Sequence, residues 1–536
     1  MFKQLLKKFM GFGGKKGSGQ GRASQPQEKR PLSANIDKNL QALRETFDLC
    51  GDVIFREFKL NAEPPIRAFV TYVGTLCDEE RAGEHVMKAL MHETTALPAN
   101  VRLTQGSALE IVQNRLVTLT ELNTSSDLLE VTKHMVNGKL ALVIDGSATA
   151  IIAGVPGWEN RAIEEPDSEP SVRGPRDGFV ENLTTNLATI RRRVKTSRLK
   201  VENIEVGVLS KQTVSVLYIK GIASDKIVAE VKERIKRIKV DNIIDSGLLQ
   251  EFIMDEEITV FPLIQTTERP DKTAASLLEG RVALIVDTTP MTLLVPATFI
   301  TFLQAAEDSY NEAFYATFIR LLRFVALNIA LLLPALYIAI TTYHQEMLPA
   351  KLLNSIAEAR SGVPFPAFVE AILMELTFEL LREAGTRLPK NVGQAVSTVG
   401  GLVIGQAAVQ AGVVSSAMVV VVALTAVASF TIPNISASFS IRILRFSLMI
   451  LAAIMGAPGI MLGLMFILFH LCGLRSFGVP YLSPFAPLSP SDLKDTFIRV
   501  PWWAMITRPR LFGAKEPVRQ ETDNGPVKPG EGGGSS

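Results

Sequence analysis

GKLALVIDGSATAIIAGVP, residues 138–156, occurs a second time in the chain as GRVALIVDTTPMTLLVPAT, residues 280–298. The two segments align without gaps, and each has two apolar runs separated by a short turn, which is the pattern of a β-hairpin. The residues before each copy, 127–137 and 272–279, have helical character. The chain is therefore predicted to contain two similar α/β lobes.

The sequence around the two hairpins extends these lobes. In the first lobe, NIDKNLQALRETFD has helical periodicity and AFVTYVGTL has the character of a buried strand. The N-terminal residues are rich in Gly, Ser, Gln and Lys, a composition typical of disorder. The predicted order is a disordered basic N-terminus (1–34), a first α/β lobe (35–156), a polar linker (157–178), a second α/β lobe (179–305), a membrane domain (306–475), an interfacial C-terminal segment (476–512) and a disordered tail (513–536).

Composition and charge argue against several classes of function. The 536-residue chain has a net charge of only +2, which does not indicate a nucleic-acid-binding protein. Its three cysteines and five histidines are scattered and show no metal-ligand spacing. The sequence also contains no phosphate loop, dinucleotide motif or nucleophile–base pair. We therefore expect no enzyme activity, no cofactor, no metal and no nucleic-acid partner.

An aspartate follows the first apolar run of each hairpin, Asp145 in the first copy and Asp287 in the second. An aspartate at a strand end can be catalytic or can accept a phosphate, but it is more often a turn residue that bonds its own backbone. Because no companion catalytic residue accompanies either aspartate, the turn role is favoured.

The second half of the chain contains the segments that can cross a membrane, for which about 20 apolar residues are needed. Residues 324–342 are uncharged, with Pro334 in the middle. The uncharged block 391–441 is too long for one crossing and divides near Gly412. A last run, 446–470, is predicted to be one span with a break at 456–459. The sequence thus predicts four spans.

Arg320 and Arg323 precede the first span, and the positive-inside tendency assigns that end to the cytoplasm. The side of the C-terminus depends on residues 365–381. If this segment re-enters the membrane and leaves on the same side, the C-terminus returns to the cytoplasm, and if the segment spans fully, the C-terminus lies outside.

That segment is PFPAFVEAILMELTFELLREAG, residues 364–385, which is apolar but carries glutamates. On a helix, Glu375, Glu379 and Glu383 fall within an arc of about 80°, while Glu370 points away from them. One interpretation is an amphipathic helix on the membrane surface. The other is a partly inserted pore helix, because carboxylates at depth are tolerated where they line a water-filled path. The predicted ion path contains Pro364, Phe365, Pro366, Glu370, Glu375 and Glu379.

Two further segments are candidates for packing and assembly. Gly401 and Gly405 have GxxxG spacing, and together with Gly400 they would let helices approach closely. RGPRDGFVENLTTNLATIRRRVKT, residues 173–196, is a turn followed by a helix whose basic end matches the helix dipole. That basic end is either a solvated face or a contact for anionic lipid headgroups or an acidic neighbouring subunit. The candidate contact residues are Arg173, Arg176, Arg191, Arg192 and Arg193.

Several long segments resemble the A subunits of GerA-type spore germinant receptors, and the resemblance extends over residues 40 to 510. They are EPDSEPSVRGPRDGFVENLTTNLATIRRR, VALIVDTTPMTLLVPATF, PFPAFVEAILMELTFELLREAGTRLP, VGQAVSTVGGLVIGQAAVQAGVVSSAMVVVVALTAVASFTIPN and FGVPYLSPFAPLSPSDLKDTFIRVPWW.

The resemblance implies a multi-pass protein of the spore inner membrane with a cytoplasmic N-terminal domain. It implies two partners, a transporter-like B subunit and a lipoprotein C subunit, and self-association as a pentamer into a germinant-gated channel for monovalent cations. Two alternatives stay open, a SpoVAF-like paralogue and a non-conducting scaffold of the germination complex. A secondary transporter is disfavoured, because such proteins show paired broken spans in two halves and the sequence predicts one broken span.

Overall fold

The computed structural model describes residues 30–62, 64–91, 104, 107–113, 119, 121–155, 157, 165–166, 168–389, 400–401, 403–490, 492–520 and 526. The chain forms two compact units, which we call the α/β unit and the helical unit. The α/β unit comprises Met1–Met254, Ile264–Pro296 and Trp502–Ser536, and the helical unit comprises Asp255–Leu263 and Ala297–Pro501. Of the predicted disordered N-terminus (1–34), residues 1–29 lie outside the described residues, as do 391–399 of the predicted span and 521–525 and 527–536 of the predicted tail. Residues 30–34 were expected to be disordered but pack on the first lobe, where Leu32 is buried and its N–H donates to the Ser126 carbonyl.

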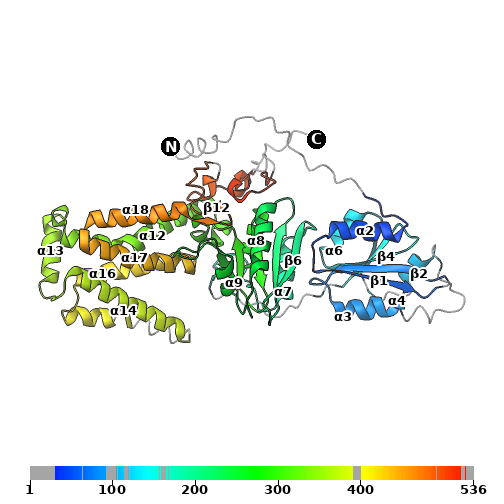
Figure 1. Ribbon diagram of the computed structural model, residues 1–536, viewed down its shortest axis with the longest axis horizontal. Coiled ribbons are helices and arrows are strands. Elements are labelled where there is room, and N and C mark those ends of the chain that lie inside the picture. The colour runs from blue at the N-terminus through cyan, green and yellow to red at the C-terminus, as the bar shows by residue number, and fades with distance from the viewer. Residues whose placement is uncertain are drawn as a thin grey trace. The chain divides into compact units, whose positions relative to one another are not determined.

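The first lobe of the α/β unit is a sheet with helices on both faces (Figure 1). Its described strands pair antiparallel in the order β1-β2-β4-β5-β3. Because both faces are covered, the central strands are apolar on both sides instead of alternating. The elements are α2 (Ile36–Thr46), β1 (Val53–Leu60), β2 (Ile66–Val73), α3 (Glu79–Ala82), η2 (Gly83–Lys88), α4 (Ala89–Met91), α5 (Ala108–Ile111), β3 (Leu122–Ser125), α6 (Leu128–Met135), β4 (Lys139–Ile144) and β5 (Ala150–Gly154).

The second lobe has the same strand order, β6-β7-β9-β10-β8, again with antiparallel pairs. One face of its sheet packs against α7 and α10 through Leu187, Ile190 and Leu277. The elements are α7 (Leu183–Arg193), β6 (Leu199–Val206), β7 (Gln212–Ile219), α8 (Asp225–Arg237), α9 (Ser246–Ile253), β8 (Gln265–Thr267), α10 (Pro270–Leu278), β9 (Val282–Val286) and β10 (Thr292–Val295).

The strand-end aspartates have the same role in both lobes. Asp145 Oδ1 accepts a hydrogen bond from the backbone N–H of Ile36 at 3.3 Å, and Asp287 Oδ1 accepts one from Leu183 at 3.3 Å. Ile36 and Leu183 are the first residues of α2 and α7, whose N–H groups have no partner within the helix. Each aspartate therefore joins the end of a strand to the start of the first helix in its lobe. Asp287 also makes the predicted local bond, to the N–H of Thr288.

A buried asparagine repeats in the same two helices. The Asn39 side chain accepts from the N–H of Ser33 and donates to the Ser33 carbonyl, and Asn186 makes both bonds to Val180. These matching contacts show that α2 and α7 are equivalent, so the internal repeat includes more than the hairpins. The alignment of residues 138–156 with 280–298 did not reach these helices.

The helical unit consists mainly of long helices that run side by side (Figure 1). Among the described residues, α12 (Ala313–Thr342) and α17 (Ile435–Met455) are long and apolar enough to cross a membrane. Two apolar helices are shorter, α16 (Ser416–Phe430) and α18 (Ala457–Gly473). The other elements are η5 (Phe299–Phe302), α11 (Glu307–Tyr310), η6 (Gln345–Met347), α13 (Ala350–Arg360), α14 (Ala367–Arg387), β11 (Arg475–Ser476), β12 (Val479–Pro480) and η7 (Leu493–Asp495).

The break predicted at 456–459 is confirmed, but it separates two helices, so the predicted single span over 446–470 is corrected. The chain reverses at Gly456, whose φ of 67° lies in the left-handed region that glycine adopts readily, and α17 and α18 pack against each other. The helix before this turn begins at Ile435 and so includes Arg442 and Arg445. The two predicted runs, 391–441 and 446–470, stop on either side of these arginines, because only uncharged residues were counted toward a span.

Contacts between helix ends define how the helices run. Near one end, Tyr343 follows α12, and its hydroxyl lies within hydrogen-bond distance of two carbonyls in the last turn of α17, those of Ala453 at 2.8 Å and Ile454 at 3.0 Å. At the other end, Ser438 in α17 donates to the carbonyl of Ser429 in α16. Because α14 contacts the start of α16 through Glu370 and its last turns through Arg382, it runs along the bundle and does not turn back as a re-entrant segment would.

Two predicted boundaries also differ from the structure. Residues 255–263 and 297–305 were assigned to the second lobe but belong to the helical unit, where Ser476 Oγ donates to the Leu263 carbonyl and accepts from the Ala297 N–H. Residues 513–520 were expected to be a disordered tail. They contact the second lobe instead, where Arg519 pairs with Glu279 at 3.0 Å.

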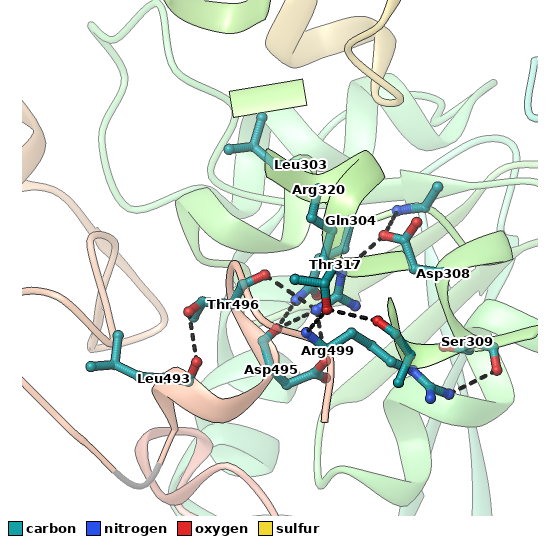
Figure 2. A network of polar contacts seen from close by, with 12 residues as sticks. Leu303, Gln304, Asp308, Ser309, Thr317, Arg320, Leu493, Asp495, Thr496 and Arg499 are labelled. Atoms are coloured by element: carbon teal, nitrogen blue, oxygen red, sulfur yellow. Dashed lines mark hydrogen bonds and ion pairs between the residues drawn. The ribbon is translucent and has the colours of Figure 1, made fainter. Parts of the chain in front are cut away.

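A polar network surrounds the first turns of α12 (Figure 2). Asp308 pairs with Arg320 at 3.1 Å and with Arg323 at 2.7 Å, and Arg320 also reaches Asp495 at 2.8 Å. Arg499 donates to the Ser309 carbonyl. The two arginines that were expected to mark the cytoplasmic end of the first span are thus held within the protein, where they join α11, α12 and η7.

Candidate functional site

The candidate site is built on α14, which carries the predicted ion-path residues. Pro366 is the residue that caps the helix, and its φ of −60° fits a helix start. Pro364, Phe365 and Pro366 are exposed. Glu370 and Glu375 are fully buried, and Glu379 is partly buried. The carboxylates thus point into the helical unit, while the proline turn lies at its surface.

Glu375 and Glu379 lie in a group of buried charges that we call the charge cluster, made of Glu375, Glu379, Arg382, Arg442 and Arg445. Arg445 Nη2 lies 2.9 Å from Glu375 Oε2 and 3.2 Å from Glu379 Oε1. Arg442 Nη1 lies 2.6 Å from Glu379 Oε2. Arg382 Nη1 lies 3.7 Å from Glu379 Oε1, and its Nη2 donates to Ser429 Oγ. The charge cluster therefore joins α14 to both α16 and α17.

Aromatic rings cover the arginines of the charge cluster. The Arg382 guanidinium lies 5.0 Å from the ring centre of Phe378 and 4.7 Å from that of Phe430. Arg442 lies 4.1 Å from the ring centre of Phe439, and Arg445 lies 5.7 Å from that of Phe446. The ring faces attract the cations and replace part of the lost hydration.

Glu370 occupies a separate site near the start of the same helix. Its Oε1 lies 3.2 Å from Arg360 Nε at the end of α13, and its Oε2 accepts from the backbone N–H of Ser415 at 3.0 Å. Ser415 is the residue that caps α16. Glu370 therefore ties the connection between α13 and α14 to the start of α16.

The positions of three of the four α14 glutamates agree with the helical geometry that the sequence predicts. Glu375 and Glu379 share one cluster, and Glu370 points elsewhere. Glu383 leaves the group, because its exposed side chain pairs with Arg387 one turn later. Each of the three ion-path glutamates is paired with arginine inside the helical unit, and Glu379 alone among them keeps some exposure, with 23% of its side chain accessible.

The sequence analysis missed Arg442 and Arg445 as site residues. A signal was present, because their spacing of three residues places them on one face of a helix, opposite in charge to Glu375 and Glu379. Arg382 was noted only as lying at the edge of the glutamate arc. The pairing itself is a contact between residues more than 60 positions apart, which local patterns do not define.

The candidate packing glycines differ in their surroundings. A methyl group added at Gly400 would lie 3.0 Å from Leu381 of α14, and one at Gly405 would lie 3.6 Å from Val419 of α16. One at Gly401 would have no described atom within 4 Å. Within one chain, Gly400 and Gly405 pack against neighbouring helices, and a packing role for Gly401 toward another subunit stays a proposal.

The basic end of α7 lies at the boundary between the two lobes. Arg191 is buried and forms two hydrogen bonds to Asp52 of the first lobe, at 2.8 Å and 2.7 Å. Beside this pair, the Gly51 N–H donates to the Val201 carbonyl, and the Val201 N–H donates to Leu49. Arg191 therefore joins the lobes and is not on the surface where a lipid headgroup would meet it.

The other candidate contact residues lie at or near the surface. Arg173, Arg176 and Arg192 are exposed, and Arg193 is partly buried and paired with Asp177. A cavity of about 460 Å³ opens at this boundary, with residues of both lobes in its wall. Its lining consists of Leu76, Val136, Asn137, Asp177, Arg192, Arg193 and Lys195. The positive charge gathered here suits an anionic group.

Comparison with known proteins confirms the resemblance in the sequence. The family described as Bacillus/Clostridium GerA spore germination protein matches residues 41–511. The membrane protein YfkQ of Bacillus subtilis is 42% identical over 505 residues, which cover 93% of this chain and 96% of YfkQ. Spore germination protein KA of the same organism is 42% identical over 504 residues, which cover 94% of this chain and 91% of that protein.

A solved structure is also similar, the crystal structure of the N-terminal domain of the A subunit of the Bacillus megaterium spore germinant receptor GerK3. It is 30% identical, with 51% of this chain and 98% of that chain covered and a TM-score of 0.41. The family match extends over most of the sequence and includes both the α/β unit and the charge cluster. The chain therefore belongs to the GerA family of spore germination proteins, as the A subunit of a germinant receptor and not as an enzyme.

Proposed function

We propose that this A subunit associates with copies of itself in the spore inner membrane and forms a germinant-gated channel for monovalent cations. It would act with a transporter-like B subunit and a lipoprotein C subunit, as the family resemblance implies. A pentamer is the proposed stoichiometry. Opening of the channel would release cations from the spore and begin germination.

The observation that carries this proposal is the charge cluster inside an apolar helical unit. Ionisable groups among apolar helices are costly, and where they occur they usually mark ion pathways, proton relays or moving charges. The cluster lies on α14 and α17, and α17 is among the helices long and apolar enough to cross a membrane.

The outward face of α14 supports a membrane location and self-association. Val369, Leu373, Leu376 and Leu380 follow one another at helical spacing, and all four are exposed in the single chain. Leu380 is 71% exposed. A row of exposed apolar side chains suits lipid or a neighbouring helix and is unfavourable in water.

The distribution of charge supports a cytoplasmic α/β unit. Arg320 and Arg323 lie in the first turns of α12, and Arg475 follows α18. The connection between α12 and α14 carries two such basic residues, Lys351 and Arg360, against the three at this end of the bundle. By the positive-inside tendency, the end of the bundle that bears the start of α12 would face the cytoplasm.

The test is to reconstitute the full-length chain with its B and C subunits into liposomes loaded with potassium ions. Nutrient broth is then added, and potassium release is recorded with an ion-selective electrode. Broth-dependent release that requires this chain would support the channel. Liposomes lacking this chain, with B and C present, are the control. Release that is equally strong without this chain would reject the channel role and leave it as a scaffold.

A second candidate function, the non-conducting scaffold, is favoured by a specific observation. Glu370 and Glu375 are fully buried and paired with Arg360 and Arg445 within one chain, so neither presents a free carboxylate to a passing ion. In that case the charges would fix the helix arrangement. The same reconstitution separates the two functions, because a scaffold would assemble with its partners while any flux would not require this chain.

A further inference from the structure

The charge cluster lies near the middle of the helix that carries most of its cations. At 1.5 Å per residue, α17 is about 31 Å long, comparable to the hydrocarbon thickness of a bilayer. Arg445 is close to its midpoint, and the Glu375 side chain that it contacts belongs to the middle part of α14. The contact thus lies at a depth where water is scarce and charge contacts are strong.

Positive charge is in excess in this cluster. The described residues bring three guanidinium groups to two carboxylates. A cation that entered along α14 would meet carboxylates that are already neutralised, together with one uncompensated positive charge. As long as the arginines stay in place, the charge cluster as a whole is positive and does not attract a passing cation.

The polar groups of the cluster are only partly satisfied. Both Glu375 carboxylate oxygens, and Nε and Nη1 of Arg445, are buried without a hydrogen-bond partner among the residues that the structure describes. The Glu375–Arg445 contact at 2.9 Å is therefore an ion pair without hydrogen-bond geometry. Glu370 differs, because its carboxylate accepts hydrogen bonds from both Arg360 and Ser415. A partly satisfied buried network has much to gain from a second arrangement that satisfies it better.

In a second arrangement, Glu379 would lose its present contacts with the arginines of α17. It bridges Arg442 at 2.6 Å and Arg445 at 3.2 Å, and Arg382 lies within 4 Å on its own helix. A rotation of α14 would separate Glu375 and Glu379 from the α17 arginines together, because both glutamates lie on one face of α14. Arg382 would move with α14, since it belongs to the same helix.

From these contacts we infer that Arg442 and Arg445 are positioning residues that hold α14 in the non-conducting state. In this inference, which rests on the proposed channel function, opening requires Glu375 and Glu379 to leave the two arginines. The ion pairs of Glu375 and Glu379 with these arginines form only in the closed state. The helix α14 is the element that moves between the closed and the open state. The arginines need not touch the ion.

The test measures potassium release without any germinant, from liposomes that contain the three-subunit complex. Arg445→Gln removes the charge that faces both glutamates and keeps the carboxylates of α14. We expect germinant-independent release to rise by about tenfold, because loss of a contact that biases a two-state element shifts its population by roughly this factor. Arg445→Lys keeps the charge and should stay close to the wild type. Arg387→Gln is the matched control, since Arg387 is an exposed residue of α14 that pairs only with Glu383 among the described residues.

Arg442→Gln provides a second, milder variant. It leaves Glu379 paired with Arg445, so it should accumulate normally and show a smaller rise in basal release. Each variant is first checked for wild-type abundance and a single peak in size-exclusion chromatography. If well-folded Arg445→Gln and Arg442→Gln show wild-type basal release while broth still triggers flux, the positioning role is wrong and the channel stands. If no complex conducts under any condition, the channel itself fails.

If neither arginine variant folds, the inference can be tested on the wild-type protein by chemical modification of its carboxyl groups. Dicyclohexylcarbodiimide enters apolar regions and modifies carboxyl groups, and ion pairing protects them. Nutrient broth should increase modification of Glu375 and Glu379, measured by mass spectrometry, and leave the exposed Glu383 unchanged. Equal modification of Glu375 and Glu379 with and without broth, in a complex that conducts, would overturn the inference.

Discussion

Arg191 of α7 and Asp52, which precedes β1, form a two-bonded ion pair across the boundary between the two lobes. Its bonds are 2.8 Å and 2.7 Å long, and both side chains are almost completely buried. Arg191 Nη1 also donates to the Leu199 carbonyl, so the guanidinium has partners on both sides. The pair fixes the lobes against each other, and its removal should be measurable.

Asp52→Asn should lower the free energy of unfolding of the α/β unit by about 3–5 kcal/mol, because it leaves the Arg191 cation buried without its partner. The variant should also expose Cys50, which lies in the same interface with its Sγ 3.5 Å from the Leu199 carbonyl. Maleimide modification of the full-length protein at pH 8, followed by mass spectrometry, measures this exposure.

Cys77 is the internal control for that experiment. It is buried within the first lobe, and burial raises the pKa of its thiol to about 12, so it stays protonated and unreactive at pH 8. Modification should therefore increase at Cys50 and not at Cys77. Equal modification of Cys50 in the wild type and in Asp52→Asn would show that the ion pair does not hold the lobes together.

The repeated asparagines make a second prediction. Asn39→Ala and Asn186→Ala should destabilise the α/β unit by similar amounts, because each leaves one backbone N–H and one carbonyl without a partner, at about 1–3 kcal/mol per buried group. Asn137→Ala is the control, since its exposed side chain bonds only the Lys133 carbonyl among the described residues. Thermal unfolding followed by circular dichroism compares the three, and a loss in only one lobe would contradict the equivalence of α2 and α7.

These contacts indicate which parts of the fold the sequence makes visible. The hairpins were recognised as copies because each is a continuous strand–turn–strand segment whose apolar pattern is local. The equivalence of α2 and α7 was not recognised, because it depends on two small polar residues, Asn39 and Asn186, whose partners are visible only in the folded lobe.

The candidate site was predictable only in part for the same reason. Helical geometry alone placed Glu375 and Glu379 together and Glu370 apart. Arg442 and Arg445 were taken to lie outside the last span, because isolated arginines are unfavourable in an apolar helix. Their carboxylate partners lie on α14, so only the three-dimensional structure shows that α17 can include them.

Asp308→Asn should disturb the start of α12. Asp308 is buried and pairs with both Arg320 and Arg323, so the loss of its charge should cost about 3–5 kcal/mol. Asp495→Asn should lower the free energy of unfolding by less than about 1 kcal/mol, because the Asp495 side chain is 42% exposed. Arg320 would also keep its hydrogen bond to the backbone carbonyl of residue 495. Thermal unfolding of the full-length protein in detergent ranks the two variants, and equal losses would contradict the assigned role of Asp308.

Arg508→Ala should release the C-terminal residues from the second lobe. Arg508 donates to the Leu278 carbonyl at the end of α10, which attaches the C-terminal segment to the second lobe. It also donates to the carbonyls of Glu516 and Val518, which fixes the fold of the segment. Trypsin should then cut faster after Lys515 and Arg519, while cleavage after the exposed Lys239 of the same unit should not change. An unchanged cleavage pattern would mean that other contacts are sufficient.

Whether the α14 carboxylates belong to the ion path is tested by potassium release from liposomes that contain the three-subunit complex. Release is compared between Glu375→Gln/Glu379→Gln and the wild type. Broth-triggered release should fall strongly in the double variant at equal protein abundance, because the open path loses the carboxylates that attract a cation, even though the closed-state pairs with Arg442 and Arg445 are lost as well. Glu383→Gln, a change of the same kind on the exposed face of α14, should release potassium like the wild type. Unchanged release in the well-folded double variant would contradict the claim that the α14 carboxylates belong to the ion path.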